Sequence, residues 1–148
     1  VELTEAASGI PDCDQGYLLE AMVIDVVAEL LIGVTFDSTG LALLTIASGG
    51  TTTEILDDSV SVILPASREE LHNAAASLKI FNLLEGFRGR EAANIDAMLD
   101  VIEAVARYVK ENSATLLELD INPLMVGTEK SIVVDALIRK SGNSSKSN

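Results

Sequence analysis

The sequence predicts an α+β domain in which a mostly antiparallel sheet carries two helices on one face. Four apolar, strand-like segments come first, two segments with helical spacing follow, and two further strands close the chain. The connections between neighbouring segments are short, which favours antiparallel pairing of successive strands. The predicted order is therefore β-β-β-β-α-α-β-β.

Composition limits the kind of protein. The chain has 148 residues and a net charge of −13, which argues against nucleic acid or an anionic membrane as partner. No apolar run reaches the length of a membrane span. The single cysteine, Cys13, cannot form an internal disulfide, so we expect a cytoplasmic protein. The chain begins at Val1 without a methionine, and we expect a fragment or a processed protein.

The first four predicted strands are separated by turn-forming residues. They cover Tyr17–Val27, Ala28–Phe36, Leu41–Ala47 and Ser59–Leu64, although the start of the second also suits a helix. A turn is expected at Asp37–Gly40, with aspartate first and glycine last. We expect residues 1–15 to be an irregular initial segment, 16–139 to be the domain, and 140–148 to be a disordered tail or linker.

Two features of this first half contain candidate binding residues. Glu20 and Glu29 are lone acids in apolar segments, and each either points to solvent or hydrogen-bonds a ligand. Ser48–Thr53 is rich in glycine and hydroxyl groups, including Gly49 and Gly50. Such a segment is either a plain hairpin loop or a loop whose backbone cradles phosphate.

Two helices are predicted next. Ser67 and Glu70 form a capping box that begins the first helix, and Gly86 ends it. His72, the only histidine, is expected on the solvated side of this helix. The second helix is expected over Asn94–Lys110. Its predicted core stripe is Ile95, Leu99, Ile102, Ala106 and Val109.

The segment between the helices, Glu85–Arg90, contains two arginines among glycines. Arg88 and Arg90 either bind an anion, which the guanidinium fork suits, or pair with nearby acids. On the second helix, Glu103 and Arg107 stand one turn apart and are expected to pair on its outer side.

The most informative stretch is Leu116–Arg139, which predicts a β-hairpin around the polar loop Gly127–Lys130. If the loop is symmetric, Asn122 and Asp135 lie directly opposite each other, because each is five residues from its end of the loop. A loop of three or five residues would shift the register and remove this pairing.

Alternation of side chains gives this hairpin two different faces. Glu118, Asp120 and Asn122 share one face with Asp135. The expected apolar face consists of Leu119, Ile121, Ile132, Val134 and Ile138. The polar face is either a platform for Mg²⁺, which prefers carboxylate and amide oxygens, or simply the acidic outer face of a sheet.

Several of these segments together resemble the second half of an ATP-grasp domain. The similarity is to ADP-forming acyl-CoA synthetases of the acetate–CoA ligase type, relatives of the succinyl-CoA synthetase β subunit. It covers about residues 16–139 and is carried by SGGTTTEILDDSVSVILP, LLEGFRGR, and ELDINPLMV followed by VVDALI. The implied fold is an ATP-grasp subdomain closed by the C-terminal hairpin.

The resemblance also implies a role for each candidate residue. Asn122 and Asp135 match the Mg²⁺ ligands, with Asp120 as a further acid beside them. The other implied site residues are Glu20 beside the adenine, Glu29 at the ribose hydroxyls, Gly49 and Gly50 in the phosphate loop, and Glu54 and Arg88 as candidate catalytic residues.

The implied function is the ATP/ADP- and Mg²⁺-binding part of an ADP-forming acid–CoA ligase. Such an enzyme converts a carboxylate, CoA and ATP to acyl-CoA, ADP and phosphate through a phosphohistidine, here expected elsewhere in the parent protein. The expected partners are a CoA-binding domain or subunit and the first half of the grasp, which this chain lacks. We therefore expect the isolated chain to be inactive.

A non-catalytic alternative remains open at this stage. It is a regulatory or docking ATP-grasp half, for example in a fused protein lysine acetyltransferase. Ala47 and Val62 stand where relatives commonly carry a loop glycine and an arginine, and this difference favours the alternative.

Overall fold

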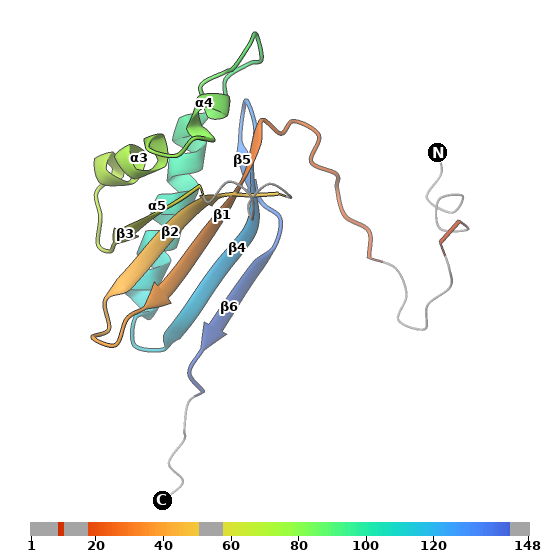
Figure 1. Cartoon of the computed structure of the whole chain (residues 1–148). Coiled ribbons are helices and arrows are strands. Elements are labelled where there is room, and N and C mark those ends of the chain that lie inside the picture. The colour runs from red at the N-terminus through yellow and green to blue at the C-terminus, as the bar shows by residue number, and fades with distance from the viewer. Residues whose placement is uncertain (1–8, 11–17, 51–57, 143–148) are drawn as a thin grey trace, which may run out of the picture.

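A single antiparallel sheet forms the framework of the computed structural model, which describes residues 9–10, 18–50 and 58–142 (Figure 1). Its strands lie in the order β3-β2-β1-β4-β5, and β6 also pairs with β4. The strands are β1 (Ala28–Phe36), β2 (Ala42–Ser48), β3 (Ser59–Ile63), β4 (Leu116–Val126), β5 (Ser131–Val133) and β6 (Ala136–Lys140). The predicted α+β class with a mostly antiparallel sheet is confirmed.

The turn between β1 and β2 forms as the sequence predicts. The Asp37 carboxylate accepts hydrogen bonds from the Thr39 and Leu41 amides at 2.8 and 2.9 Å. It also accepts the Thr39 hydroxyl proton at 2.7 Å, and Gly40 takes the positive φ of 86° that closes the turn. These bonds fix the antiparallel register that pairs Phe36 with Ala42.

In the described part of the chain, two helices begin at side-chain caps, of which the sequence predicted the one at Ser67. α3 (Arg68–Ala76) begins at Ser67, whose side chain and backbone exchange hydrogen bonds with Glu70. α5 (Ile95–Asn112) begins at Asn94, whose side-chain oxygen accepts the Ala97 amide at 2.9 Å.

The predicted first helix is wrong in its length. It ends at Ala76, and a separate short helix, α4 (Phe81–Leu84), follows. The buried Asp58 carboxylate causes this interruption, because it accepts the amides of Lys79 and Ile80 at 2.8 and 2.9 Å. Those two amides therefore bond to a side chain rather than to carbonyls of the preceding helical turn.

Two further expectations for the helices are corrected. His72 is half-buried rather than solvated, and its ring meets the edge of Phe81 with centroids 5.7 Å apart. Glu103 does not pair with Arg107; it binds Arg68, which also holds Asp96 and Asp100. The long arginine of α3 thus joins the two helices through three acids of α5.

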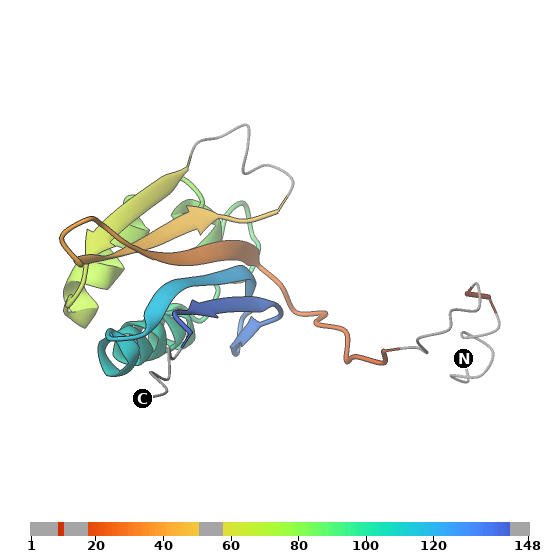
Figure 2. The same cartoon turned by 90° about the horizontal axis from the view of Figure 1, so that it is seen from below.

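The hydrophobic core lies between one face of the sheet and the helices. Figures 1 and 2 show α3 and α5 on the same side of the sheet. The buried residues of α5 are Met98, Leu99, Ile102, Val105 and Val109, so the predicted stripe is right at three positions. Ile95 and Ala106 are only half-buried, because α5 turns its Met98 and Val105 side toward the sheet.

The predicted strand at Tyr17–Val27 is wrong over its described residues, 18–27. This segment leaves the sheet as an extended chain (Figures 1 and 2), and Leu18, Met22 and Ile24 are 85–87% exposed. Its apolar composition favours a strand, but a strand needs a hydrogen-bonding neighbour. Within the described residues, only the Val27 amide makes a ladder-like bond, to the Val126 carbonyl at 2.8 Å.

Asn94 connects α5 to the hairpin that follows it. Its backbone amide donates to the Gly127 carbonyl at 2.9 Å, and its side-chain nitrogen donates to the Glu129 carbonyl at 2.9 Å. With the bond to Ala97, one residue caps the helix and anchors the β4–β5 loop.

We predict that Asn94→Ala lowers the free energy of unfolding by about 1–2 kcal/mol, the usual range for losing a helix cap. Asn94→Asp keeps the capping oxygen and should lose less. Urea denaturation of both variants measures the difference. Equal losses would show that the cap itself contributes nothing.

Candidate functional site

The closing hairpin has the register that the sequence predicts. β4 pairs with β5 through Leu124 and Val133, and with β6 through Ile121 and Ala136. Asn122 stands opposite Asp135 between these two ladders, and its amide donates to the Asp135 carbonyl at 3.2 Å. The returning chain is divided into two short strands at this point, which a simple hairpin did not predict.

The polar face of the hairpin carries the predicted set of oxygen-bearing side chains. Glu118 and Asp120 are half-buried, whereas Asn122 and Asp135 are exposed. Glu118 is paired with Arg139 at 2.9 Å. The Asp120 carboxylate lies beside the bare backbone of Gly33 on β1, 3.8 Å from where a Cβ would stand.

Asp120 is the acid of this face whose pKa is shifted by its surroundings. The pKa of Asp120 is raised above 3.8, first by burial and then by the charges of Glu118 and Asp135. The negative charges of Glu118 and Asp135 that contribute to this shift would also attract a cation to the face. Asp120 and Asp135 therefore interact electrostatically, which agrees with their predicted positions on the same face of the hairpin.

The predicted apolar face of the hairpin is only partly buried. Leu119 and Ile121 on β4 are buried, and Ile132 is half-buried. Val134 and Ile138 are 46% and 45% exposed, contrary to expectation. They belong to the returning chain at the margin of the sheet, where the described part of the chain offers nothing to cover them.

Glu29, Gly49 and Gly50 lie together at the other end of β1 and β2. The Gly49 amide donates to the Glu29 carbonyl at 2.7 Å, and a Cβ on Gly49 would stand 2.9 Å from that carbonyl. Gly50 has a φ of 79°, and a Cβ there would stand 3.3 Å from Oε2 of Glu29. Both glycines thus have a structural reason to be glycine, whether or not they bind phosphate.

Two further predicted site residues, Glu20 and Arg88, are not brought together with these clusters. Glu20 is exposed on the extended segment. Arg88 has a φ of 52° and places its guanidinium over the Phe87 ring, 5.1 Å from the centroid. Glu54 lies outside the described residues.

Sequence reasoning missed Asp25, which attaches the extended segment to the hairpin loop. Its carboxylate accepts the Thr128 hydroxyl at 2.7 Å and the Thr128 amide at 3.1 Å. A Cβ on Gly127 would come within 2.2 Å of the Asp25 carbonyl oxygen, so only glycine allows this approach. A lone acid in an apolar run was the one available signal.

The residues of the polar face fit a hard divalent cation that takes its other ligands from phosphates and water. Among the described residues, no group of three or more His, Cys, Asp and Glu side chains is arranged to hold a metal by itself. Asn122 and Asp135 offer two oxygen-bearing side chains, and Mg²⁺ commonly uses one or two protein groups with phosphates and water. Asp120 lies on the same face, and its pKa is raised by burial first and then by the charges of Glu118 and Asp135.

With this geometry established, comparison with known proteins identifies the family. Residues 8–139 match the ATP-grasp domain family, and the chain belongs to it. It is 32% identical over 130 residues to the β subunit of ADP-forming acetate–CoA ligase II of Pyrococcus furiosus, covering 86% of this chain and 55% of that subunit. It is also 32% identical over 121 residues to ADP-forming acetate–CoA ligase I of Archaeoglobus fulgidus, covering 82% of this chain and 17% of that protein.

Solved structures show the same fold. A protein of Pyrococcus horikoshii superposes with a TM-score of 0.75 at 28% identity, over 81% of this chain and 51% of that one. The dinucleotide-forming acetyl-coenzyme A synthetase 1 of Ca. Korarchaeum cryptofilum, in complex with coenzyme A and Mg-AMPPCP, superposes with a TM-score of 0.73 at 29% identity. That match covers 81% of this chain and 55% of the synthetase chain. In the described part of the present chain, no helix is long and apolar enough to cross a membrane.

The raised pKa of Asp120 generates a stability prediction with a definite sign. The folded protein holds this proton to a higher pH than the unfolded chain does, so the ionised carboxyl lowers stability above that window. Asp120→Asn should therefore be more stable than the wild type near about pH 7. The gain should vanish near about pH 3, where the carboxyl is protonated in both states.

Urea denaturation at both pH values measures this difference. Glu129→Gln, an exposed acid in the loop of the same hairpin, is the matched control and should change stability little. A loss of stability in Asp120→Asn near neutral pH would contradict the electrostatic account.

Proposed function

We propose that this chain is the nucleotide- and Mg²⁺-binding half of an ADP-forming acid–CoA ligase. The observation that carries the proposal is the cross-strand pair of Asn122 and Asp135, which places two oxygen-bearing side chains on the face that also carries Asp120. The relatives named above as ADP-forming acetate–CoA ligases, and the synthetase solved with Mg-AMPPCP, support this choice of nucleotide and metal.

In the proposed site, Asn122 and Asp135 hold the cation against the nucleotide phosphates, and Asp120 supplies further negative charge beside them. When bound, Mg²⁺ neutralises phosphate charge and so favours phosphoryl transfer. Glu29 meets the ribose hydroxyls through its carboxylate, next to Gly50 at the start of the phosphate loop. Arg88 and Glu54 remain candidates for contact with the transferred phosphoryl group, and Glu20 for the adenine side.

The wider reaction is part of the proposal. A histidine carried by another part of the enzyme takes the phosphoryl group from ATP, which leaves as ADP, and the phosphohistidine passes the group to a carboxylate. The CoA thiol then attacks the resulting acyl phosphate, so that the thioester forms and phosphate leaves. The proposed partners are a CoA-binding domain or subunit and the other half of the grasp. The chain spans about half of the P. furiosus subunit, which leaves room there for that other half.

A non-catalytic regulatory or docking half is the second candidate. Val62, where relatives commonly carry an arginine, packs against the hydrophobic core instead. Gly49 and Gly50 are required by their close approach to Glu29, so their presence does not by itself favour catalysis.

Titration calorimetry with ADP, in excess Mg²⁺ and in EDTA, tests the binding role. We expect binding that requires Mg²⁺ and that weakens at least about tenfold in Asp135→Ala, because one of two protein oxygen ligands is lost. Glu129→Gln, the exposed acid of the same hairpin, should bind like the wild type.

Two outcomes would contradict the proposal. One is equal affinity for ADP in Mg²⁺ and in EDTA. The other is an unchanged affinity in Asp135→Ala. If the chain alone gives no heat, the titration is repeated with the other half of the domain added, and absence of binding there rejects the nucleotide site.

A further inference from the structure

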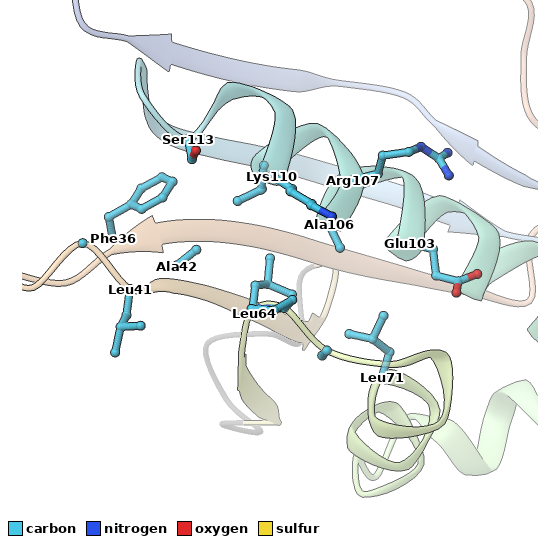
Figure 3. Close-up of a pocket in the computed structure, with 14 residues that line it drawn as sticks. Phe36, Leu41, Ala42, Leu64, Leu71, Glu103, Ala106, Arg107, Lys110 and Ser113 are labelled. Atoms are coloured by element: carbon cyan, nitrogen blue, oxygen red, sulfur yellow. The ribbon is translucent and has the colours of Figure 1, made fainter.

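A groove of about 590 Å³ lies on the helix side of the sheet, away from the polar face of the hairpin (Figure 3). It reaches the β1–β2 turn at Gly40 and the last turns of α5 at Lys110. Glu29 and Gly49 stand at the opposite end of β1 and β2, because the register pairs Phe36 with Ala42 at one end and Leu30 with Ser48 at the other. The groove is therefore separate from the proposed nucleotide site.

The wall of the groove is mainly apolar. Phe36 from β1, Leu64 after β3, Leu71 from α3 and Val109 from α5 all line it. Figure 3 shows Phe36 and Leu64 pointing toward α5. A cleft of about 300–1,000 Å³ with apolar walls and a few polar groups is the usual form of a small-molecule site.

Two cations of α5 give the groove its charge. Arg107 and Lys110 line it one helical turn apart, and neither makes an ion pair among the described residues. This is notable in a chain of net charge −13, in which acids outnumber bases by 23 to 10. Their positive charge suits an anion, whereas their methylene stems extend the apolar wall.

The acids near the groove determine where such an anion sits. Glu103 lines the groove at its α3 end and is bound by Arg68 together with Asp96 and Asp100. Because three acids share one arginine, the α3 end of the groove keeps a net negative charge and repels an anionic ligand. An anionic group is therefore directed toward Arg107 and Lys110, with its apolar part over Phe36 and Leu64.

We propose that this groove binds a small carboxylic acid with an apolar body. The apolar walls, the size and the two cations without ion pairs carry the proposal together. It stands apart from the proposed nucleotide site, because none of its lining residues belongs to that site.

The test uses octanoate as probe, titrated into the 148-residue chain by calorimetry and by amide chemical shifts. We expect saturable binding with shifts at Leu41, Ala66 and Ala106, which line the groove. The double variant Arg107→Gln, Lys110→Gln should lower the affinity for octanoate about five- to tenfold, because two exposed charge contacts are lost. Its affinity for neutral octanol should stay within about twofold, because the apolar contacts are unchanged.

Lys130→Gln, an exposed lysine in the β4–β5 loop, is the matched charge control and should bind octanoate like the wild type. Ala106→Leu, which fills the groove, should remove binding of both probes while the thermal unfolding curve stays cooperative. Absence of octanoate binding at about 5 mM would overturn the proposal. An equal loss of octanoate affinity in Lys130→Gln would also overturn it. The same holds if octanoate binding is unchanged in both the double variant and Ala106→Leu.

Discussion

The pairing of β4 on both of its sides is the constraint on which the rest of the structure depends. β1 pairs along one side, and β5 and β6 share the other. The residues of β4 buried beneath the helices are Leu116, Leu119, Ile121, Leu124 and Val126. Leu119 and Ile121 alternate with Glu118, Asp120 and Asn122, so these three polar residues lie on the opposite face. Leu116 and Leu124 reach the core because the strand register shifts on either side of this stretch. A slip of one residue would bury carboxylates and expose leucines, so the hydrophobic core itself holds the polar face in register.

The same constraint explains the electrostatic character of that face. Arg139 pairs with Glu118, and Asp120 is held beside Gly33, where burial first and the charges of Glu118 and Asp135 second raise its pKa. The fold therefore maintains like charges near one another, at a cost in stability that a bound cation would relieve. The Asn94 bridge to the β4–β5 loop keeps this hairpin in place relative to α5. The core packing of β4 and the Asn94 bonds to the β4–β5 loop thus both hold the hairpin that carries the proposed ligands.

The sequence predicts best what depends on neighbouring residues and least what depends on distant ones. The opposition of Asn122 and Asp135 follows from a symmetric loop, and the capping box at Ser67 is a local pattern. In contrast, the long first helix is interrupted by Asp58, 21 residues before the amide of Lys79 that it binds. Glu103 binds Arg68, 35 residues away, instead of its neighbour on the helix. The predicted strand before β1 failed for the same reason: its composition suits a strand, but pairing needs a neighbour that local sequence cannot specify.

The central claim is that β4 and its returning strands hold carboxylates together as a platform for a divalent cation. The most direct measurement is a ¹³C NMR titration of the Asp120 carboxyl, with and without Mg²⁺ and in Asp135→Asn. The account predicts a pKa above the ordinary value of about 3.9, lowered by Asp135→Asn and lowered further when Mg²⁺ and ADP bind. An ordinary pKa that responds neither to the substitution nor to the metal would contradict it.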